Sequence, residues 1–462
     1  MKTKHLFIAT AIILAGSATI LSVGTRHPLT NKKSPDANPK EITSKAIAIN
    51  DIKDVTTKPK SLPAKKTEPP KCVFKTAFEG EGLDQGFYYK IPGKVMATMN
   101  KGLEWMEEAQ LNDGGWGAGS HSRQDMTDPH AVPSDPATTA MVAMAIQRCG
   151  SDLQQGPYSR NLKKALFYLL DQVESSPENA SNITSLTNTQ PQIKLGQNID
   201  VVLTSQFLTN ILDDLDHDPQ LKNRVKKCVK KCVDKIEMGH SANGSMKGSG
   251  WAGVLQSSFA TSALESAKDE GIEVDEKILD NSRDYQKGNI NPGDNSVETE
   301  SAAGIVLYSV SGSTRASAKE TAEAKDKIKQ ARKEGKIKNE EVTVDNLQKA
   351  GLSESQAMKY STAYQINKSA KKLAQDDNVI SGFGNNGGEE FLSYLQTGEG
   401  MIMSKDNDWQ SWYDKTSGRL LGIQNQDGSW SGHHCITSPV FCTATCLLIL
   451  SVNNDIDKLT GN

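Results

Sequence analysis

Residues 420–452 constrain the fold more than any other part of the sequence, because a glycine turn there is followed by a segment that is apolar on nearly every side. In the turn, residues 427–430 (DGSW), Gly428 accepts a positive φ angle and Asp427 can hydrogen-bond to its own backbone. The apolar residues of 441–452 surround the predicted helix, which is typical of a helix buried all round. An outer helix followed by such an inner helix cannot cover its own core, so units of this kind occur in arrays.

Earlier segments repeat this unit. A DGGW turn at 113–116 precedes a small-residue helix at 135–146, and an Asn-Gly-Ser turn precedes the stretch Phe259-Ala260-Thr261. Weaker candidates for inner helices are residues 203–212, 297–310 and 389–403. Six pairs of an outer and an inner helix would close a ring, which removes the exposed ends that an open array has to cap.

The repeated pattern of Gln, then Asp-Gly-Gly/Ser-Trp, then a Thr-Ala helix resembles the repeat of squalene and oxidosqualene cyclases and of protein prenyltransferase β subunits. The resemblance covers about residues 94–452 and implies an all-α fold. This fold is an α/α toroid, in which six outer/inner helix hairpins close a ring around a central cavity. The same ring also carries pectate lyases and non-enzymatic thioester domains, so the resemblance specifies the fold and not the chemistry. The tail GHHCITSPVFCTATC is similar to that of exported bacterial proteins of this repeat type whose function is not known.

The composition divides the chain into segments. Residues 1–24 have a basic start and a long apolar run, which predicts a signal peptide or an N-terminal membrane anchor. Residues 25–85 are a Lys/Pro-rich stretch read as a disordered linker, and residues 86–455 form the toroid. Within it, the charged residues 313–376 predict an inserted helical hairpin. We therefore expect an exported protein, periplasmic or facing the extracellular side, that meets the membrane only through its N-terminal segment.

Net charge and motifs limit the partners. The net charge is -3 and no RNA-binding motif occurs, so no nucleic-acid partner is expected. A small molecule, a glycan or a peptide in the central cavity is the expected ligand.

Seven cysteines are present, and in an oxidising compartment some should pair. Spacing does not give the connectivity; one bridge among Cys435, Cys442 and Cys446 is the preferred interpretation. The alternative is a zinc site, because these thiols lie within fourteen residues of His433 and His434 and suit tetrahedral zinc. No cofactor is otherwise indicated.

The loop at 117–136 is long, and it carries several His and Asp residues that can bind a metal or act as an acid–base pair. The alternative is a solvated loop whose aspartates cap helices. The same choice arises for the acids before the predicted helix at 297–310, which can cap the helix or point into the cavity mouth. The rim or cavity candidates are Trp116, His121, Asp125, Asp128, Trp251, Glu298, Glu300 and Trp430, and the catalytic candidates are Asp135, His130 and His434.

The chemistry of the resembling enzymes is only partly matched. Squalene–hopene cyclases protonate an alkene with the central Asp of an Asp-x-Asp-Asp-Thr-Ala motif, whereas residues 135–140 read DPATTA and keep a single Asp135. Only 6% of the chain is aromatic, which argues against a cavity that stabilises cations. The Asp-x-Cys pair of prenyltransferases has no match, and Arg123 beside Asp125 is a faint counterpart of a lyase site.

Two hypotheses follow. The first is an exported toroid that binds a ligand or a protein segment in its central cavity. The second is an enzyme that acts on an isoprenoid or a polysaccharide at the ring mouth. In the second hypothesis loop 117–136 and residues 427–446 face each other, and ring closure predicts this proximity because it puts the first and last units side by side.

Overall fold

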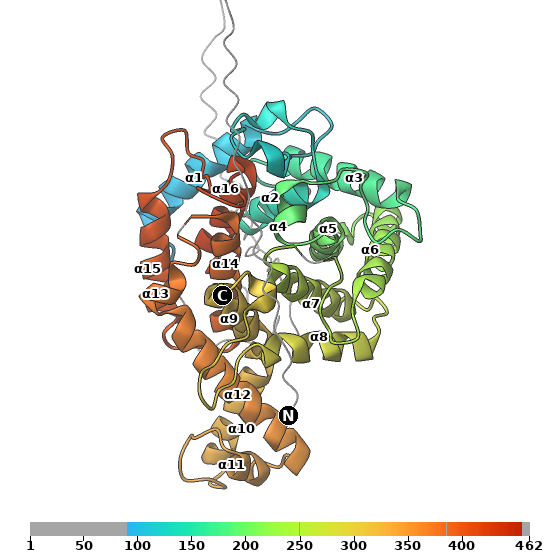
Figure 1. Cartoon of the computed structure of the whole chain (residues 1–462). Helices are drawn as coiled ribbons and strands as arrows, with labels where there is room; N and C mark the ends of the chain where they lie inside the picture. The colour runs from blue at the N-terminus through green and yellow to red at the C-terminus, as the bar shows by residue number, and fades with distance from the viewer. Residues whose placement is uncertain (1–89, 249, 385, 455–462) are drawn as a thin grey trace, which may run out of the picture. The chain divides into compact units, whose positions relative to one another are not determined.

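The computed structural model describes residues 90–248, 250–384 and 386–454, and over these residues the regular structure is helical, with three isolated β-bridges (Figure 1). The predicted signal or anchor, residues 1–24, and the whole of the predicted linker, residues 25–85, lie outside the described residues. No helix in the described part combines the length and the apolarity that a membrane crossing requires. The predicted all-α class is therefore confirmed for the described part of the chain.

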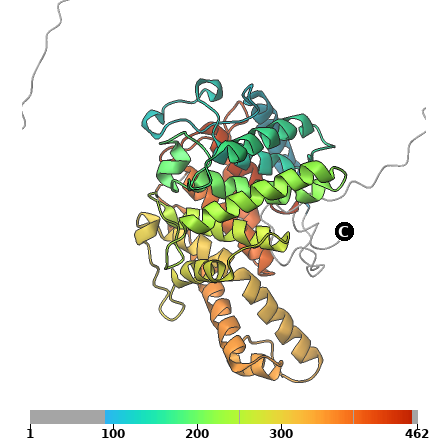
Figure 2. The ribbon, with the colours of Figure 1, turned by 90° about the vertical axis from the view of Figure 1, so that its right-hand side faces the viewer.

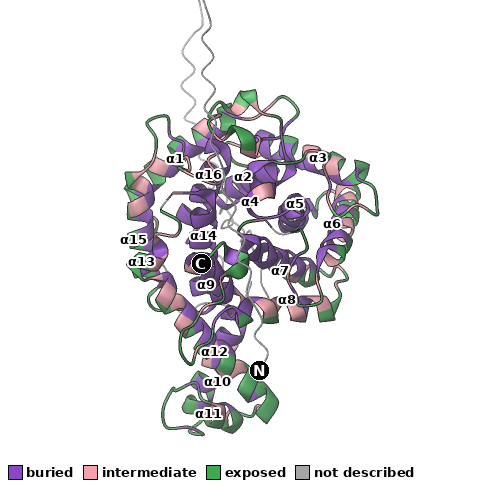
Figure 3. Cartoon of the chain, viewed as in Figure 1, coloured by how far each residue is buried: buried purple, intermediate pink, exposed green. Residues whose placement is uncertain are grey.

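Six inner helices contact one another in cyclic order, and the last of them, α16, packs against the first, α2. Nearly all of their residues are buried (Figure 3), because each has neighbours on both sides and an outer helix behind it. This all-round burial was predicted for the last unit from its lack of a polar face. The inner helices are α2 (Pro136–Arg148), α5 (Ile199–Asn210), α7 (Gly253–Asp269), α9 (Val306–Ala316), α14 (Gly388–Met403) and α16 (Pro439–Leu450).

The outer helices are amphipathic. In α3, for example, Leu162, Leu166, Leu169 and Val173 face the core at helical spacing and the remaining face is largely exposed. The outer helices are α1 (Gly93–Glu108), α3 (Ser159–Ser175), α6 (Pro219–Gly239), α8 (Glu276–Gly288) and α15 (Trp409–Gly422). Short helices lie in the connections: α4 (Gln190–Lys194), α13 (Asp377–Ile380) and four 3-10 turns at His121–Arg123, Pro129–Ala131, Leu212–Leu215 and Glu300–Ala302.

The tryptophans of the two strongest repeats join each turn to its helix pair. The indole nitrogen of Trp116 donates to the Met106 carbonyl oxygen at 3.0 Å, and that of Trp430 donates to the Leu420 carbonyl oxygen at 2.9 Å. Both side chains are fully buried. The structure thus places these two predicted rim residues inside the core, where they hold the turn against the outer helix.

The glycine of the last turn is required by its surroundings. Gly428 has φ of 96°, and a Cβ atom there would lie 2.6 Å from the Lys101 carbonyl oxygen. The left-handed turn predicted from the sequence is present, and its close approach to α1 leaves no room for a side chain.

Three helices form an arm that projects from the ring (Figure 2): α10 (Ala318–Lys333), α11 (Val344–Lys349) and α12 (Glu354–Ala374). The arm has a small apolar core of its own around Ile328 and Leu347. The boundaries differ from the predicted insertion, because residues 313–316 belong to inner helix α9 and the last turns of α12 pack on α9 as an outer helix. The apolar stripe by which α12 packs on α9 is narrow. It consists of Ile366, Ala370 and Ala374, which are four residues apart among charged neighbours.

The C-terminal ends of inner helices share a buried ion cluster. The Glu399 carboxylate of α14 accepts a short hydrogen bond from Arg148 of α2 and lies 3.4 Å from the guanidinium of Arg315 of α9. Arg148 also donates to the Leu448 carbonyl oxygen of α16 at 3.2 Å. The Glu399 carboxylate and Arg148 together therefore connect four inner helices at this end.

We expect Glu399→Gln to lower the free energy of unfolding by about 3–5 kcal/mol, because both buried arginines then lose the negative charge of Glu399. Urea unfolding followed by circular dichroism measures the change. Glu340→Gln is the matched control, since Glu340 pairs with Arg332 on the surface with both side chains 54% exposed, and its loss should cost less than about 1 kcal/mol. Equal effects of the two substitutions would contradict the assigned role of the cluster.

Candidate functional site

The N-terminal ends of the inner helices lie together, at the end of the ring opposite the ion cluster. The backbone amide of Ala137 at the start of α2 donates to Asp200 in the first turn of α5 at 3.2 Å. At the start of α9, the Tyr308 hydroxyl donates to Glu390 in the first turn of α14 at 2.6 Å. The inner helices therefore run in the same direction. Their positive dipole ends lie together at one end of the ring, which we call the mouth, and carboxylates are favoured there.

The two loops predicted to face each other do meet at this mouth. The Thr437 hydroxyl donates to the Gln124 carbonyl oxygen at 2.8 Å. The backbone amides of Thr437 and Ser438 both donate to the side-chain oxygen of Gln190, at 2.7 and 3.0 Å. Closure of the ring by α16 and α2 therefore brings residues 117–136 and 427–446 into contact, with α4 between them.

Five ionisable side chains gather at the mouth: Lys194 of α4, Glu389 and Glu390 of α14, and His434 and Cys435 of the loop before α16. We call this group the rim cluster. Lys194 and Glu389 act electrostatically on the Cys435 thiol, and the His434 ring lies 4.0 Å from the Glu390 carboxylate. The cluster thus combines three segments that are distant in the sequence.

Glu390 is held rigidly within the rim cluster. Besides the Tyr308 hydroxyl, the backbone amides of Phe383 and Gly387 donate to it, at 2.9 and 3.0 Å. Burial and then the Glu390 carboxylate raise the pKa of Tyr308, so this phenol stays protonated and acts as a donor. With these three donors, Glu390 positions the loop and helix start around it.

Glu389 is a buried carboxyl group of the rim cluster whose pKa is strongly shifted. Burial, followed by the charge of Glu390, raises the pKa of Glu389 to about 8. The Ile436 backbone amide donates a hydrogen bond to its carboxyl group at 3.3 Å. Near neutral pH this side chain is a carboxylic acid that can donate a proton or a hydrogen bond.

Cys435 is a half-buried thiol beside this acid. Burial and then Glu389 raise its pKa to about 11, so the thiol is protonated. Its backbone has φ of 62°, a left-handed conformation that residues other than glycine seldom adopt. The neighbouring His433 amide donates to the Asn386 carbonyl oxygen at 2.7 Å, which holds the loop in this form. Such backbone strain is concentrated at functional sites.

Two exposed aromatic rings border the rim cluster. Trp251 is 63% exposed, and the ammonium group of Lys194 lies 4.3 Å from its ring centroid. Phe383 is 58% exposed, and its ring meets that of His434 edge to face at 5.3 Å. An exposed aromatic surface thus touches the cluster on the Lys194 side and on the His434 side.

The other residues of the predicted site fall into two groups. Asp135 is fully buried as the N-cap of α2, where it accepts from Thr138 and from the Ala118 amide, and burial followed by Asp200 raises its pKa. It is a structural cap. His121 lies close enough to the rim cluster to be affected by Lys194: burial, followed by the charge of Lys194, lowers the pKa of His121. The remaining ones are exposed and away from the cluster's contacts: Asp125 pairs with Arg123, Asp128 caps the turn at His130, and Glu298 and Glu300 precede α9.

The predicted disulfide is wrong for the described residues. Cys435, Cys442 and Cys446 are free thiols, as are Cys149, Cys228 and Cys232, whereas Cys72 lies outside the described residues. The reason is orientation: Cys442 donates to the Ile436 carbonyl oxygen at 3.4 Å, Cys446 is buried in the core of α16, and Cys435 faces Lys194 and Glu389.

The zinc interpretation is not realised either. No group of three or more His, Cys, Asp or Glu side chains suited to a metal occurs within residues 90–248, 250–384 and 386–454. His433 and His434 therefore do not join the three thiols as a ligand set, although all five are close in sequence.

Sequence reasoning missed Lys194, Tyr308, Glu389 and Glu390 as site residues. The adjacent acids Glu389 and Glu390 open a predicted inner helix, and that position was a usable signal. Lys194 lies in a polar connection without any motif, and only the folded ring brings it to the mouth.

Comparison with known proteins gives one match. Residues 90–181 match a family model described as the squalene-hopene cyclase C-terminal domain. This match covers about a fifth of the chain, contains α1, α2 and α3, and confirms the predicted repeat family there. No match was found among the curated proteins. The matched residues do not include the rim cluster.

We expect the unfolding free energy to fall as pH rises from about 4.5 through 8. The folded state holds a proton on Glu389 that the unfolded chain releases near its ordinary pKa, so the stabilisation is present at low pH and lost as pH passes the raised pKa of about 8. Glu389→Gln should remove a pH-dependent difference on the order of 2–4 kcal/mol. Denaturant unfolding from pH 4.5 to 9 measures this, with exposed Glu300→Gln as control. Parallel pH profiles for the wild type and Glu389→Gln would contradict the assignment.

We expect iodoacetamide to label Cys435 before Cys442 and Cys446 in the native protein, because Cys435 is half-buried and the other two are fully buried. Timed labelling followed by peptide mass spectrometry gives the order. Cys435→Ser should leave the labelling of Cys442 and Cys446 unchanged. Labelling of all three at one rate would show that the loop before α16 does not shield its core as described.

Proposed function

We propose that this chain, which carries a repeat of the squalene-hopene cyclase type at residues 90–181, is an exported α/α toroid that binds a polar ligand at its rim cluster. The observation that carries this proposal is the convergence of Lys194, Glu389 and Cys435, from three separate segments, beside the exposed ring of Trp251. A few converging polar groups next to an aromatic surface are typical of ligand sites.

The chemistry of the cluster favours a glycan or a peptide segment as ligand. Lys194 is a donor and the acid form of Glu389 can donate and accept, so a ligand hydroxyl or amide that reaches these two buried side chains finds partners there. Trp251 and Phe383 offer flat apolar faces that can stack on a sugar ring or a side chain. The ligand would thus lie across the mouth instead of being enclosed in the ring.

Cyclisation of an isoprenoid is poorly supported by the same residues. Asp135, the counterpart of the cyclase acid, accepts hydrogen bonds at both carboxylate oxygens and is occupied as a helix cap. Neighbouring inner helices also carry buried polar pairs, such as Gln206 with Ser266 at 2.9 Å and Ser311 with Gln396 at 3.4 Å. Inner helices that carry such polar groups are a poor match for a wholly apolar chain.

A polysaccharide hydrolase or lyase is the second candidate, and Glu389 favours it. A carboxyl group that stays protonated near neutral pH is suited to act as a general acid on a leaving oxygen. In that case Glu389→Gln would abolish turnover while leaving glycan binding in place. For a binding protein, the same variant would alter affinity and no product would form with either protein.

Export and tethering belong to the proposal as well. The basic start and apolar run of residues 1–24 support export, and the Lys/Pro-rich residues 25–85 would connect the ring to a membrane anchor if residues 1–24 are retained. The ring would then work in the periplasm or outside the cell, where glycans and peptides are accessible.

Tryptophan fluorescence tests the proposal, because Trp251 is far more exposed than Trp116, Trp409, Trp412 and Trp430, which are buried. We expect a glycan hexamer or a decapeptide from a defined panel to shift the emission, and Trp251→Ala to abolish the shift and weaken binding at least about tenfold. Phe167→Ala, which removes an exposed ring on outer helix α3, is the matched control and should change nothing. Ligand binding that survives both Trp251→Ala and Lys194→Ala would place the site elsewhere and overturn the proposal.

A further inference from the structure

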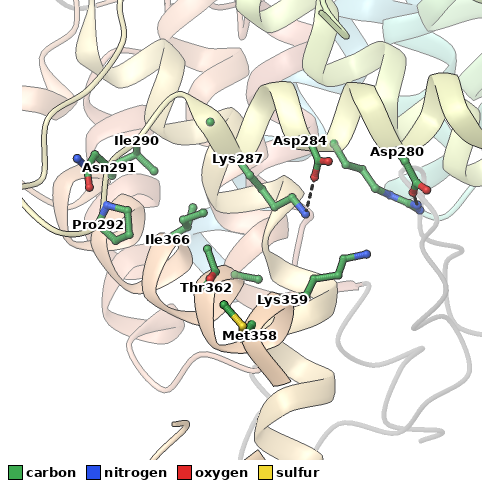
Figure 4. Close-up of a pocket in the computed structure, with 13 residues that line it drawn as sticks. Asp280, Asp284, Lys287, Ile290, Asn291, Pro292, Met358, Lys359, Thr362 and Ile366 are labelled. Atoms are coloured by element: carbon green, nitrogen blue, oxygen red, sulfur yellow. Dashed lines mark hydrogen bonds and ion pairs between the residues drawn. The ribbon is translucent and has the colours of Figure 1, made fainter. Parts of the chain in front are cut away.

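A groove separates α8 of the ring from α12 of the arm, and none of its lining residues belongs to the rim cluster (Figure 4). Its volume is about 760 Å³. Pockets for small molecules span roughly 300–1,000 Å³, so the groove has the size of a ligand site. It lies where the arm joins the ring, between two helices that contribute opposite walls.

One part of the groove is apolar. Ile290 and Pro292, from the loop after α8, lie near Ile366 of α12, with Met358 further along the same helix (Figure 4). Met358 is 55% exposed, which is unusual for a large apolar side chain. A flexible thioether in a groove adapts to alkyl groups of different shape. This part of the groove suits an alkyl chain.

The other part of the groove is charged, and its two lysines contact two acids, one buried and one exposed. The ammonium group of Lys287 lies 3.1 and 3.2 Å from the two oxygens of Glu320, and that of Lys359 lies 3.2 Å from the same carboxylate. Two cations thus share one buried acid. Asp284 lies 3.1 Å from Lys287, but its side chain is 73% exposed and water screens its charge.

The third cation that lines the groove is already paired with two acids. Arg283 lies 2.6 Å from Glu265 and 3.3 Å from Asp280. Lys359 is different, because its side chain is 56% exposed and it shares the Glu320 carboxylate with Lys287. An incoming anion therefore meets Lys359 first, with Lys287 behind it.

We propose that this groove binds an amphiphilic anion, with a carboxylate or phosphate monoester at Lys359 and Lys287 and an alkyl chain over Met358, Ile366 and Ile290. The charged and apolar parts of the groove lie side by side, as the head and tail of such a ligand do. A bound ligand would contact both α8 and α12 and so hold the arm against the ring. This site is independent of the proposed ligand at the ring mouth.

The test uses decyl phosphate and decanoate below their micelle concentrations, with octyl glucoside and decyltrimethylammonium as the neutral and cationic counterparts. We expect isothermal titration of the full chain to show binding of the two anions only. Lys359→Gln should weaken binding about tenfold, because a charge-assisted contact is lost. Met358→Asp should weaken it as well. Lys163→Gln on exposed α3 is the matched control and should have no effect.

Two further measurements locate the site and the source of the ligand. Hydrogen exchange should show protection of α12 by decyl phosphate, and Trp251→Ala should leave this protection unchanged. Lys359 is 56% exposed, so Lys359→Gln should fold normally and keep the test valid. Co-sedimentation with phosphatidylglycerol vesicles separates a membrane lipid from a free amphiphile as the source. Equal binding of neutral, cationic and anionic probes, or unchanged affinity in Lys359→Gln and Met358→Asp, would overturn the proposal.

Discussion

The packing of α16 against α2 is the contact on which the rest of the structure depends, because it closes the ring of inner helices. A single outer–inner hairpin cannot bury its inner helix, and an open array would leave two apolar faces at its ends. Closure covers both faces without any cap. It also places residues 117–136 against residues 427–446, so the same contact that completes the core builds the mouth where Thr437 meets Gln124.

The ring was predictable where the sequence repeats itself. The apolar segment before Val452 and the two DG-Trp turns specify buried helices and left-handed glycines, and α16, Gly428 and Trp430 follow this expectation closely. The arm was harder to delimit. The contact of α12 with α9 depends on alanines spaced four apart within a charged helix, and small residues give a weak signal because their close packing appears only in the folded structure.

The candidate site was predictable only in its position. Ring closure predicted which two loops would meet. Which side chains form the site depends on which side chains point toward the rim cluster, and the sequence does not give that direction. Asp135 looked like the cyclase acid and is a helix cap, and Cys442 looked like a disulfide partner and faces a carbonyl oxygen. Lys194 became a neighbour of Cys435 only through the path of α4, which carries no motif. Direction of side chains, not residue type, separated the site from its surroundings.

The seam of the ring has a consequence for how the chain can be connected. Helix α1 packs against both α15 and α16, so the chain enters and leaves the described ring at one place. The spatial order of the hairpins is therefore the same whichever connection between two helices is cut. A circularly permuted chain, joined at this seam and cut in the exposed turn between α10 and α11, would keep every inner-helix contact. The ring fold therefore does not require the chain to enter and leave at this seam.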